Sequence, residues 1–222
     1  MNQGGKMEKI ESGIRKDKVA GIEVLRIPVR VTFLEEALGM APASKEVYRA
    51  FIAAKAPDAP TTEEEVAAYG VDEVADAGMT RFPRSADGEP IMLDYQVKGF
   101  FKDSCGFLRR VKGTKSSKVT AYKKVIDGTI FIEPREIALK LPVGRECGVC
   151  ERPLRAQTAQ GERVALASSE TVPAGTQIDF DVLLLNATDE GLVREWLDYG
   201  CLHGLLQWRN SGKGRFAWEI RG

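Results

Sequence analysis

The chain has 222 residues, of which 43% are hydrophobic and 29% are charged, so it is large enough to bury a core and has an ordinary globular composition. It has no apolar run long enough to span a membrane, and the polar first residues, MNQGGKMEKIESG, lack the apolar centre of a signal peptide. Four scattered cysteines do not form the framework of a secreted disulfide-rich protein. We therefore expect a cytoplasmic protein without membrane association, with a disordered lead-in over residues 1–20.

The 32 basic and 32 acidic residues give a formal net charge of zero, but they are segregated along the chain. Residues 98–124 contain nine basic residues and one acidic residue, whereas residues 35–77 contain ten acidic and three basic residues. The neutral total argues against a generic nucleic-acid coat, while the dense basic segment is able to bind a polyanion. A solvated basic loop explains this segment equally well at this stage.

The first predicted element is a strand over 22–33, which is rich in β-branched residues. An Ala- and Glu-rich block follows, in which Ser44 is placed as a helix N-cap and two prolines as stops, so an acidic helical insertion is expected at about 35–80. Residues 91–97 are expected to be extended, and Gly99 to turn the chain into a helix with an apolar face. A flexible basic loop is predicted at 112–118.

Strands are then predicted at 119–126 and 129–141, joined by an Asp127-Gly128 hairpin, before an irregular stretch at 142–162. Strands at 163–169 and 176–185, a helix from Asp189 to about Leu206 and a closing strand at 215–220 complete the order. Without the insertion, this order predicts an α+β, ferredoxin-like or RRM-like domain over 21–222, with an antiparallel sheet and two helices on one face. The other face of such a sheet is free to carry a ligand.

Two segments combine glycine with basic residues, namely QVKGFFKDSCGFLRR and GLLQWRNSGKGRF. Glycine permits close approach of the backbone to a ligand, arginine and lysine neutralise phosphate, and an aromatic ring such as that of Trp208 can stack on a base. The alternative is that the glycines only shape the ends of helices and strands, with Trp208 packed inside.

In this order the two segments resemble the RAMP superfamily of CRISPR RNA-binding proteins, whose backbone subunits assemble along guide RNA. The resemblance covers about 90–220, and the strand after Pro173 is similar as well. It departs from the superfamily where DYQV precedes the lysine in place of Pro-Gly-Ser. It implies an RNA-binding role, and the texture of the sequence also resembles that of bacteriophage proteins, which implies a phage-encoded member. The positions that match the two superfamily motifs are Lys98, Gly99, Lys102, Arg209, Gly212, Gly214 and Phe216.

The expected nucleic-acid interface combines these two segments with the basic loop and with the arginine- and glutamine-rich stretch 152–163. Arginine suits phosphate, and glutamine suits base edges or 2′-hydroxyl groups, although an irregular loop that satisfies its own backbone is an equally simple reading of 152–163. The predicted interface residues are Lys98, Gly99, Lys102, Arg109, Arg110, Lys112, Lys115, Arg152, Arg155, Gln157, Gln160, Arg209, Asn210, Lys213 and Arg215.

Few residues point to catalysis. His203 is the single histidine, so a histidine dyad or a multi-histidine metal site is excluded. The spacing of Cys147, Cys150 and Cys201 with His203 is a weak zinc signal, and the aspartates near the basic segments form no recognisable carboxylate pair. We expect a non-catalytic protein without a cofactor that binds RNA in preference to single-stranded DNA, with self-assembly along the nucleic acid as an option. The alternatives are an interaction or decoy module acting through the acidic insertion, and a metal-dependent ribonuclease.

Overall fold

The computed structural model describes residues 13–42, 79–158 and 161–222. Its main antiparallel sheet has the spatial order β12 (Phe216–Ile220), β2 (Ile22–Phe33), β11 (Gln177–Leu184) and β7 (Ile130–Glu133). A fifth strand, β1 (Arg15–Val19), pairs with the first part of β2, on the same side as β12. Strand β2 is therefore central, which fits its β-branched sequence.

Side chains of β2 alternate between the two faces of the main sheet, as the period of a strand requires. From Leu25 to Phe33 the odd-numbered residues are buried and face the helices, while Arg26 and Arg30 lie on the opposite face. The same alternation in β11 buries Ile178, Phe180 and Val182. The buried residues of β2 that face the helices are Leu25, Ile27, Val29, Val31 and Phe33.

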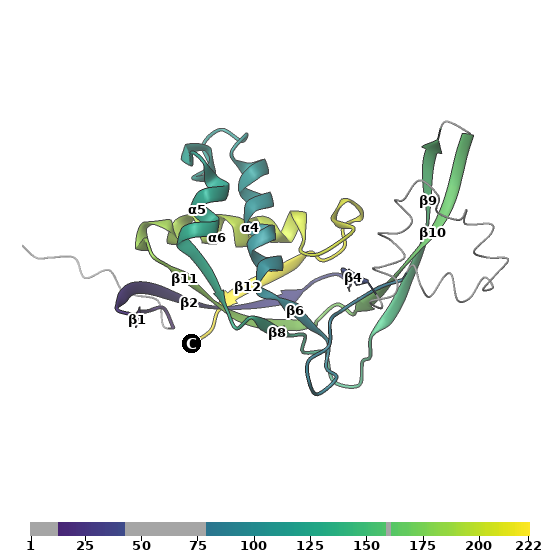
Figure 1. Ribbon diagram of the computed structural model, residues 1–222, viewed down its shortest axis with the longest axis horizontal. Coiled ribbons are helices and arrows are strands. Elements are labelled where there is room, and N and C mark those ends of the chain that lie inside the picture. The colour runs from purple at the N-terminus through teal and green to yellow at the C-terminus, as the bar shows by residue number, and fades with distance from the viewer. Residues whose placement is uncertain (1–12, 43–78, 159–160) are drawn as a thin grey trace, which may run out of the picture.

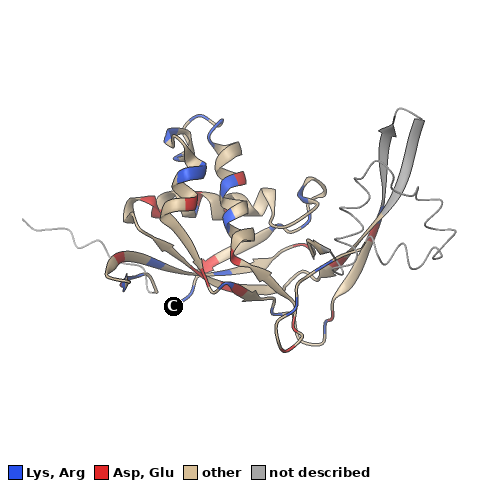
Figure 2. Cartoon of the chain, viewed as in Figure 1, with Lys and Arg blue, Asp and Glu red and all other residues tan. Residues whose placement is uncertain are grey.

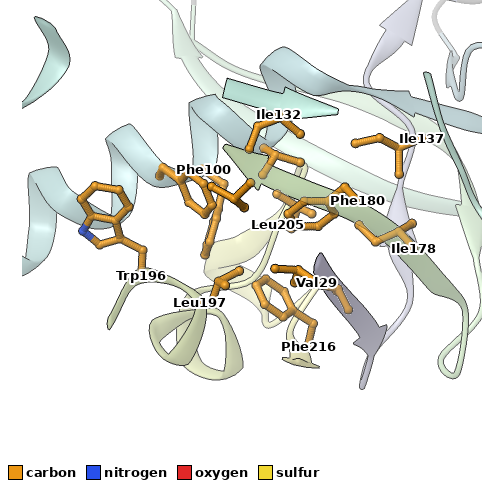
Figure 3. Close-up of a cluster of buried hydrophobic side chains, with 14 of the residues drawn as sticks. Val29, Phe100, Ile132, Ile137, Ile178, Phe180, Trp196, Leu197, Leu205 and Phe216 are labelled. Atoms are coloured by element: carbon orange, nitrogen blue, oxygen red, sulfur yellow. The ribbon is translucent and has the colours of Figure 1, made fainter. Parts of the chain in front are cut away.

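Three described helices, α4 (Asp94–Leu108), α5 (Tyr122–Thr129) and α6 (Glu190–His203), lie on one face of the main sheet (Figure 1). Helix α4 begins at Asp94, where the Gln96 side chain accepts the backbone N–H of Leu93 (2.8 Å) and satisfies one of the free groups at the helix start. Figure 3 shows Phe100 of α4 and Leu197 of α6 in one core with Phe216 of β12.

The chain order β2, α4, β7, β11, α6, β12 and the spatial order of the four strands are those of a ferredoxin-like domain. The α+β fold class expected from the sequence is confirmed. Helix α5 is an addition to it, because it stands between α4 and β7 on the same face as the two expected helices (Figure 1).

A second sheet is built around a long hairpin of β9 (Gly148–Thr158) and β10 (Gly161–Val172), which projects away from the main sheet (Figure 1). At its base, β10 pairs with β3 (Ala37–Leu38) and β5 (Thr80–Arg81), and β5 pairs with β4 (Ala41–Pro42). Strands β6 (Ile91–Leu93) and β8 (Glu136–Ala138) form a further two-stranded sheet.

Several predictions of local structure are wrong. The strand expected at 119–126 is replaced by α5, in which Tyr122 and the buried Ile126 are one helical turn apart, so Asp127-Gly128 ends a helix instead of forming a hairpin. The stretch 142–162, expected to be irregular, contains β9, whose pairing with β10 holds it extended. The extended stretch expected up to 97 is already helical from Asp94.

The ends of the predicted lead-in and insertion also differ from expectation. Residues 15–19 form β1 because the positive φ angles of Ala20 and Gly21 allow a tight turn into β2, so the predicted lead-in of 1–20 is too long. The predicted helical insertion falls mainly on residues 43–78, which are outside the described ranges, and its described ends form β3, β4 and the start of β5. Within the described ranges, no helix has the length and apolarity to cross a membrane.

Candidate nucleic-acid interface

The glycine-rich loop, residues 204–215, connects α6 to β12. Gly204, Gly212 and Gly214 have positive φ angles, and a Cβ atom on Gly214 would lie 2.0 Å from the carbonyl oxygen of Leu205. Leu206 and Trp208 also have positive φ, which is unusual for residues with a side chain. The glycines are therefore needed for the path of the loop itself.

Each predicted cation of this loop is held by a carboxylate. Arg209 pairs with Asp103 of α4, and Lys213 pairs with Glu36. The hydrogen bond from Lys213 to Glu36 raises the pKa of this lysine. Arg215 pairs with Glu35 at 2.8 Å. The positive charge of the loop is thus compensated within the protein.

The first glycine segment lies inside helix α4 instead of at its start. The ammonium group of Lys98 donates to the carbonyl of Asp127 (3.2 Å) and lies over the ring of Phe131, and its partial burial lowers its pKa. Lys102 pairs with the Asp127 carboxylate at 2.5 Å. A Cβ atom on Gly99 would meet nothing within 4 Å, so this glycine does not serve a close backbone approach within the chain. The predicted glycine turn at this position is wrong.

The remaining basic residues of this region form a surface that we call the basic cap. They lie at the ends of α4 and α5 farthest from the main sheet and in the loop between them (Figure 2). All are exposed, and none is within 4.0 Å of a carboxylate of the described residues. The cap therefore carries uncompensated positive charge. Its residues are Arg109, Arg110, Lys112, Lys115, Lys118, Lys123 and Lys124.

The loop of the cap is tied to α6 by one glutamate. The Glu195 carboxylate accepts the backbone N–H groups of Lys115 (2.6 Å) and Ser116 (2.9 Å) and the Ser116 hydroxyl (2.5 Å). The indole of the buried Trp196 donates to the same hydroxyl (2.9 Å). The cap loop is consequently anchored at Lys115 and Ser116, whereas the sequence predicted a flexible loop.

The hairpin meets the glycine-rich loop through Arg152. Its guanidinium stacks on the ring of Trp208 and donates to the Ser211 hydroxyl (3.2 Å). Of the other predicted residues, Asn210 is exposed in the glycine-rich loop, and Arg155 and Gln157 belong to β9. Gln160 is outside the described residues. The structure thus divides most of the predicted cations into the basic cap, a compensated cluster at the glycine-rich loop and two lysines beside Asp127.

The open face of the main sheet, where an RRM-like domain would present a ligand site, carries a network of ion pairs. Arg26 contacts Asp17 (2.6 Å), Glu133 (2.9 Å) and Asp181 (2.9 Å). Asp179 pairs with Arg30 (2.8 Å) and Lys140 (2.7 Å), and the hydrogen bonds from Arg30 hold the pKa of Asp179 well below its usual range. Charges at alternate positions of β2 and β11 were the available sequence signal for this network.

The residues considered for catalysis also form hydrogen bonds and ion pairs within the protein. The imidazole of His203 is 2.8 Å from Asp103 and 3.0 Å from Arg209. Asp94, another of the aspartates near the basic segments, pairs with Arg135 at 3.0 Å. Across the described ranges, no three His, Cys, Asp or Glu side chains are grouped so that they could hold a metal ion. Cys147 lines a cavity of about 400 Å³ together with Arg84 and Glu170, and burial raises its pKa.

The sequence matches no protein-family model and no curated protein. The structure is similar to a chain in the cryo-EM structure of the Type III-B Cmr-beta bound to cognate target RNA, with a TM-score of 0.52 and 9% sequence identity. The match covers 90% of this chain but 59% of the other, so this chain spans less than two thirds of the length of its structural neighbour. At this level of identity the similarity shows a shared fold.

Proposed function

We propose that the protein binds single-stranded RNA through the basic cap and does so without catalysis. The observation that carries the proposal is the set of seven exposed cations without a carboxylate partner in the described structure. Glu195 anchors the backbone of the cap loop at Lys115 and Ser116, so less ordering of this loop is required on binding. The fold shared with a chain of an RNA-bound complex supports RNA as the polyanion.

The cap is favoured over the glycine-rich loop because its cations can contact phosphate without first breaking an ion pair. A free cation releases condensed counterions when it meets a phosphate, and this release provides much of the binding free energy. Arg209, Lys213 and Arg215 would first have to leave Asp103, Glu36 and Glu35, respectively. The ion-paired open face of the sheet has the same disadvantage.

The proposal is tested with the variant Arg110→Gln/Lys112→Gln/Lys123→Gln and fluorescence anisotropy of a labelled single-stranded RNA oligonucleotide at several salt concentrations. Affinity of the wild type should fall as salt rises, and the triple variant should reduce the slope of log K against log salt by about 2, because single-stranded contacts contribute about 0.7 each. Affinity at low salt should fall at least about tenfold.

The matched control is Lys16→Gln/Lys18→Gln/Arg145→Gln, which removes the same charge from exposed positions elsewhere. It should bind RNA as the wild type does. Equal weakening by both variants would show a nonspecific effect of net charge, and unchanged binding by the cap variant would reject the cap as the interface.

A further inference from the structure

Phe107 is a large apolar side chain that the core does not use. It belongs to the last turn of α4 and is 46% exposed. The buried face of α4 is formed by other residues, among them Phe100, Phe101 and Cys105. Burial of a phenylalanine side chain usually contributes to stability, so folding of the described structure does not account for this ring.

One side of the Phe107 ring packs against His203 of α6. Its centroid is 5.2 Å from that of His203, which in turn stacks on Tyr199 at 5.1 Å with an interplanar angle of 15°. The hydrogen bond between His203 and Asp103 (2.8 Å) fixes the imidazole. The exposed ring therefore has a fixed neighbour, which lowers the cost of holding it in one orientation for a ligand.

The ring is also adjacent to the basic cap. Arg110 follows it by three residues, and its backbone N–H donates to the carbonyl of Phe107 (3.1 Å), so both side chains leave the same turn. Between them in the sequence, Arg109 lies over the ring of Tyr122 at 5.3 Å. A strand whose phosphates contact Arg110 would have its bases within reach of Phe107.

We infer that Phe107 stacks on an unpaired base of the RNA held by the basic cap. This inference rests on the proposed function and makes the surface selective for single strands, since the bases of a duplex are already stacked on one another. Aromatic side chains of this kind bind bases with little dependence on sequence. A docking site for a protein would instead draw on other exposed apolar residues, among them Leu202 of α6, which is 71% exposed.

The test compares Phe107→Ala with Leu202→Ala, using a labelled single-stranded RNA oligonucleotide and the same oligonucleotide annealed to its complement. Phe107→Ala should weaken single-strand binding by about fivefold or more, the effect of removing one stacked base contact. Its duplex binding should not change, and Leu202→Ala should bind both probes as the wild type does. Phe107→Trp should retain single-strand affinity, because the indole also stacks. Thermal unfolding checks that each variant is folded.

The outcomes separate this inference from the proposed function. If the cap variant weakens binding but Phe107→Ala does not, the stacking role is rejected and the cap stands. If Phe107→Ala and Leu202→Ala lose affinity equally, or if duplex binding falls in parallel, a general apolar surface replaces the stacking residue. Failure of the wild type to bind the single strand would reject both.

Discussion

Gly99 and Gly200 both lie within helices that pack on the main sheet, but their surroundings differ. A Cβ atom on Gly99 would meet nothing within 4 Å, whereas one on Gly200 would lie 2.0 Å from the ring of Phe216. Gly200 therefore allows α6 to approach β12 closely, and Gly99 has no such role. Sequence inspection cannot separate the two cases, because the difference lies in what each glycine faces.

We expect Gly99→Ala to raise the free energy of unfolding by about 0.5–1 kcal/mol, because alanine loses less backbone entropy in a helix. Gly200→Ala should lower it by about 1–3 kcal/mol through overpacking against Phe216. Urea unfolding measures both changes. Gly99→Ala should also leave RNA affinity unchanged, and a loss of affinity would bring back Gly99 as a point of contact between backbone and ligand.

Asp179 makes stability depend on acid pH. Its hydrogen bonds from Arg30 hold its pKa below the usual value, so the folded state binds this proton less readily than the unfolded state does. The resulting stabilisation is present above about pH 3.9, the ordinary aspartate pKa, and is lost as pH falls through the folded value. Asp179→Asn should therefore be less stable at neutral pH and should lose less stability on acidification.

The measurement is urea unfolding at neutral pH and at about pH 3, compared between the wild type and this variant. Asp87→Asn, which changes an exposed turn aspartate, is the control and should keep the acid sensitivity of the wild type. If acid lowers the free energy of unfolding as much in Asp179→Asn as in the wild type, Asp179 is not the source of the acid sensitivity.

Among the elements, those with a strong local signal were predictable. Strand β2, strand β11, helix α6 and strand β12 appear close to their expected positions, because alternation or a 3.6-residue period is visible in each sequence. Helix α5 and strand β9 were missed, since Asp127-Gly128 resembles a hairpin turn and the glycines near Cys147 resemble a loop. In both cases contacts with another element determine the local structure. Helix α5 packs against α4 and β7, and strand β9 pairs with β10.

The link between α6 and the loop of the basic cap gives a prediction at this scale. Glu195→Ala removes three hydrogen bonds to Lys115 and Ser116, and hydrogen bonds to a charged group contribute about 1.5–3 kcal/mol. We expect unfolding free energy to fall by about 2 kcal/mol and amide hydrogen exchange at these two residues to become faster.

Glu190→Ala is the matched control on the same helix. Glu190 forms a partly exposed ion pair with Arg194, which lies one helical turn after it. This substitution should cost about 0.5 kcal/mol or less and leave exchange in the loop unchanged. Similar losses in the two variants would mean that Glu195 is not an anchor.

In the whole molecule, the sequence revealed the cations of the candidate site but not their partners. The basic cap was predictable because its residues are close together in the chain. The compensation of Arg209, Lys213 and Arg215 was not, because Asp103, Glu36 and Glu35 are 106, 177 and 180 residues away in the sequence, respectively. Only the folded chain shows which of these cations are paired with carboxylates.

The basic cap also has an electrical consequence. Because the 32 basic and 32 acidic residues balance, the surplus of positive charge at the cap is matched by an equal negative surplus over the rest of the chain. Such a molecule is a dipole, and near a polyanion it would rotate so that the cap arrives first and the acidic remainder points away. A cation-exchange column should accordingly retain the protein at neutral pH in spite of its zero net charge.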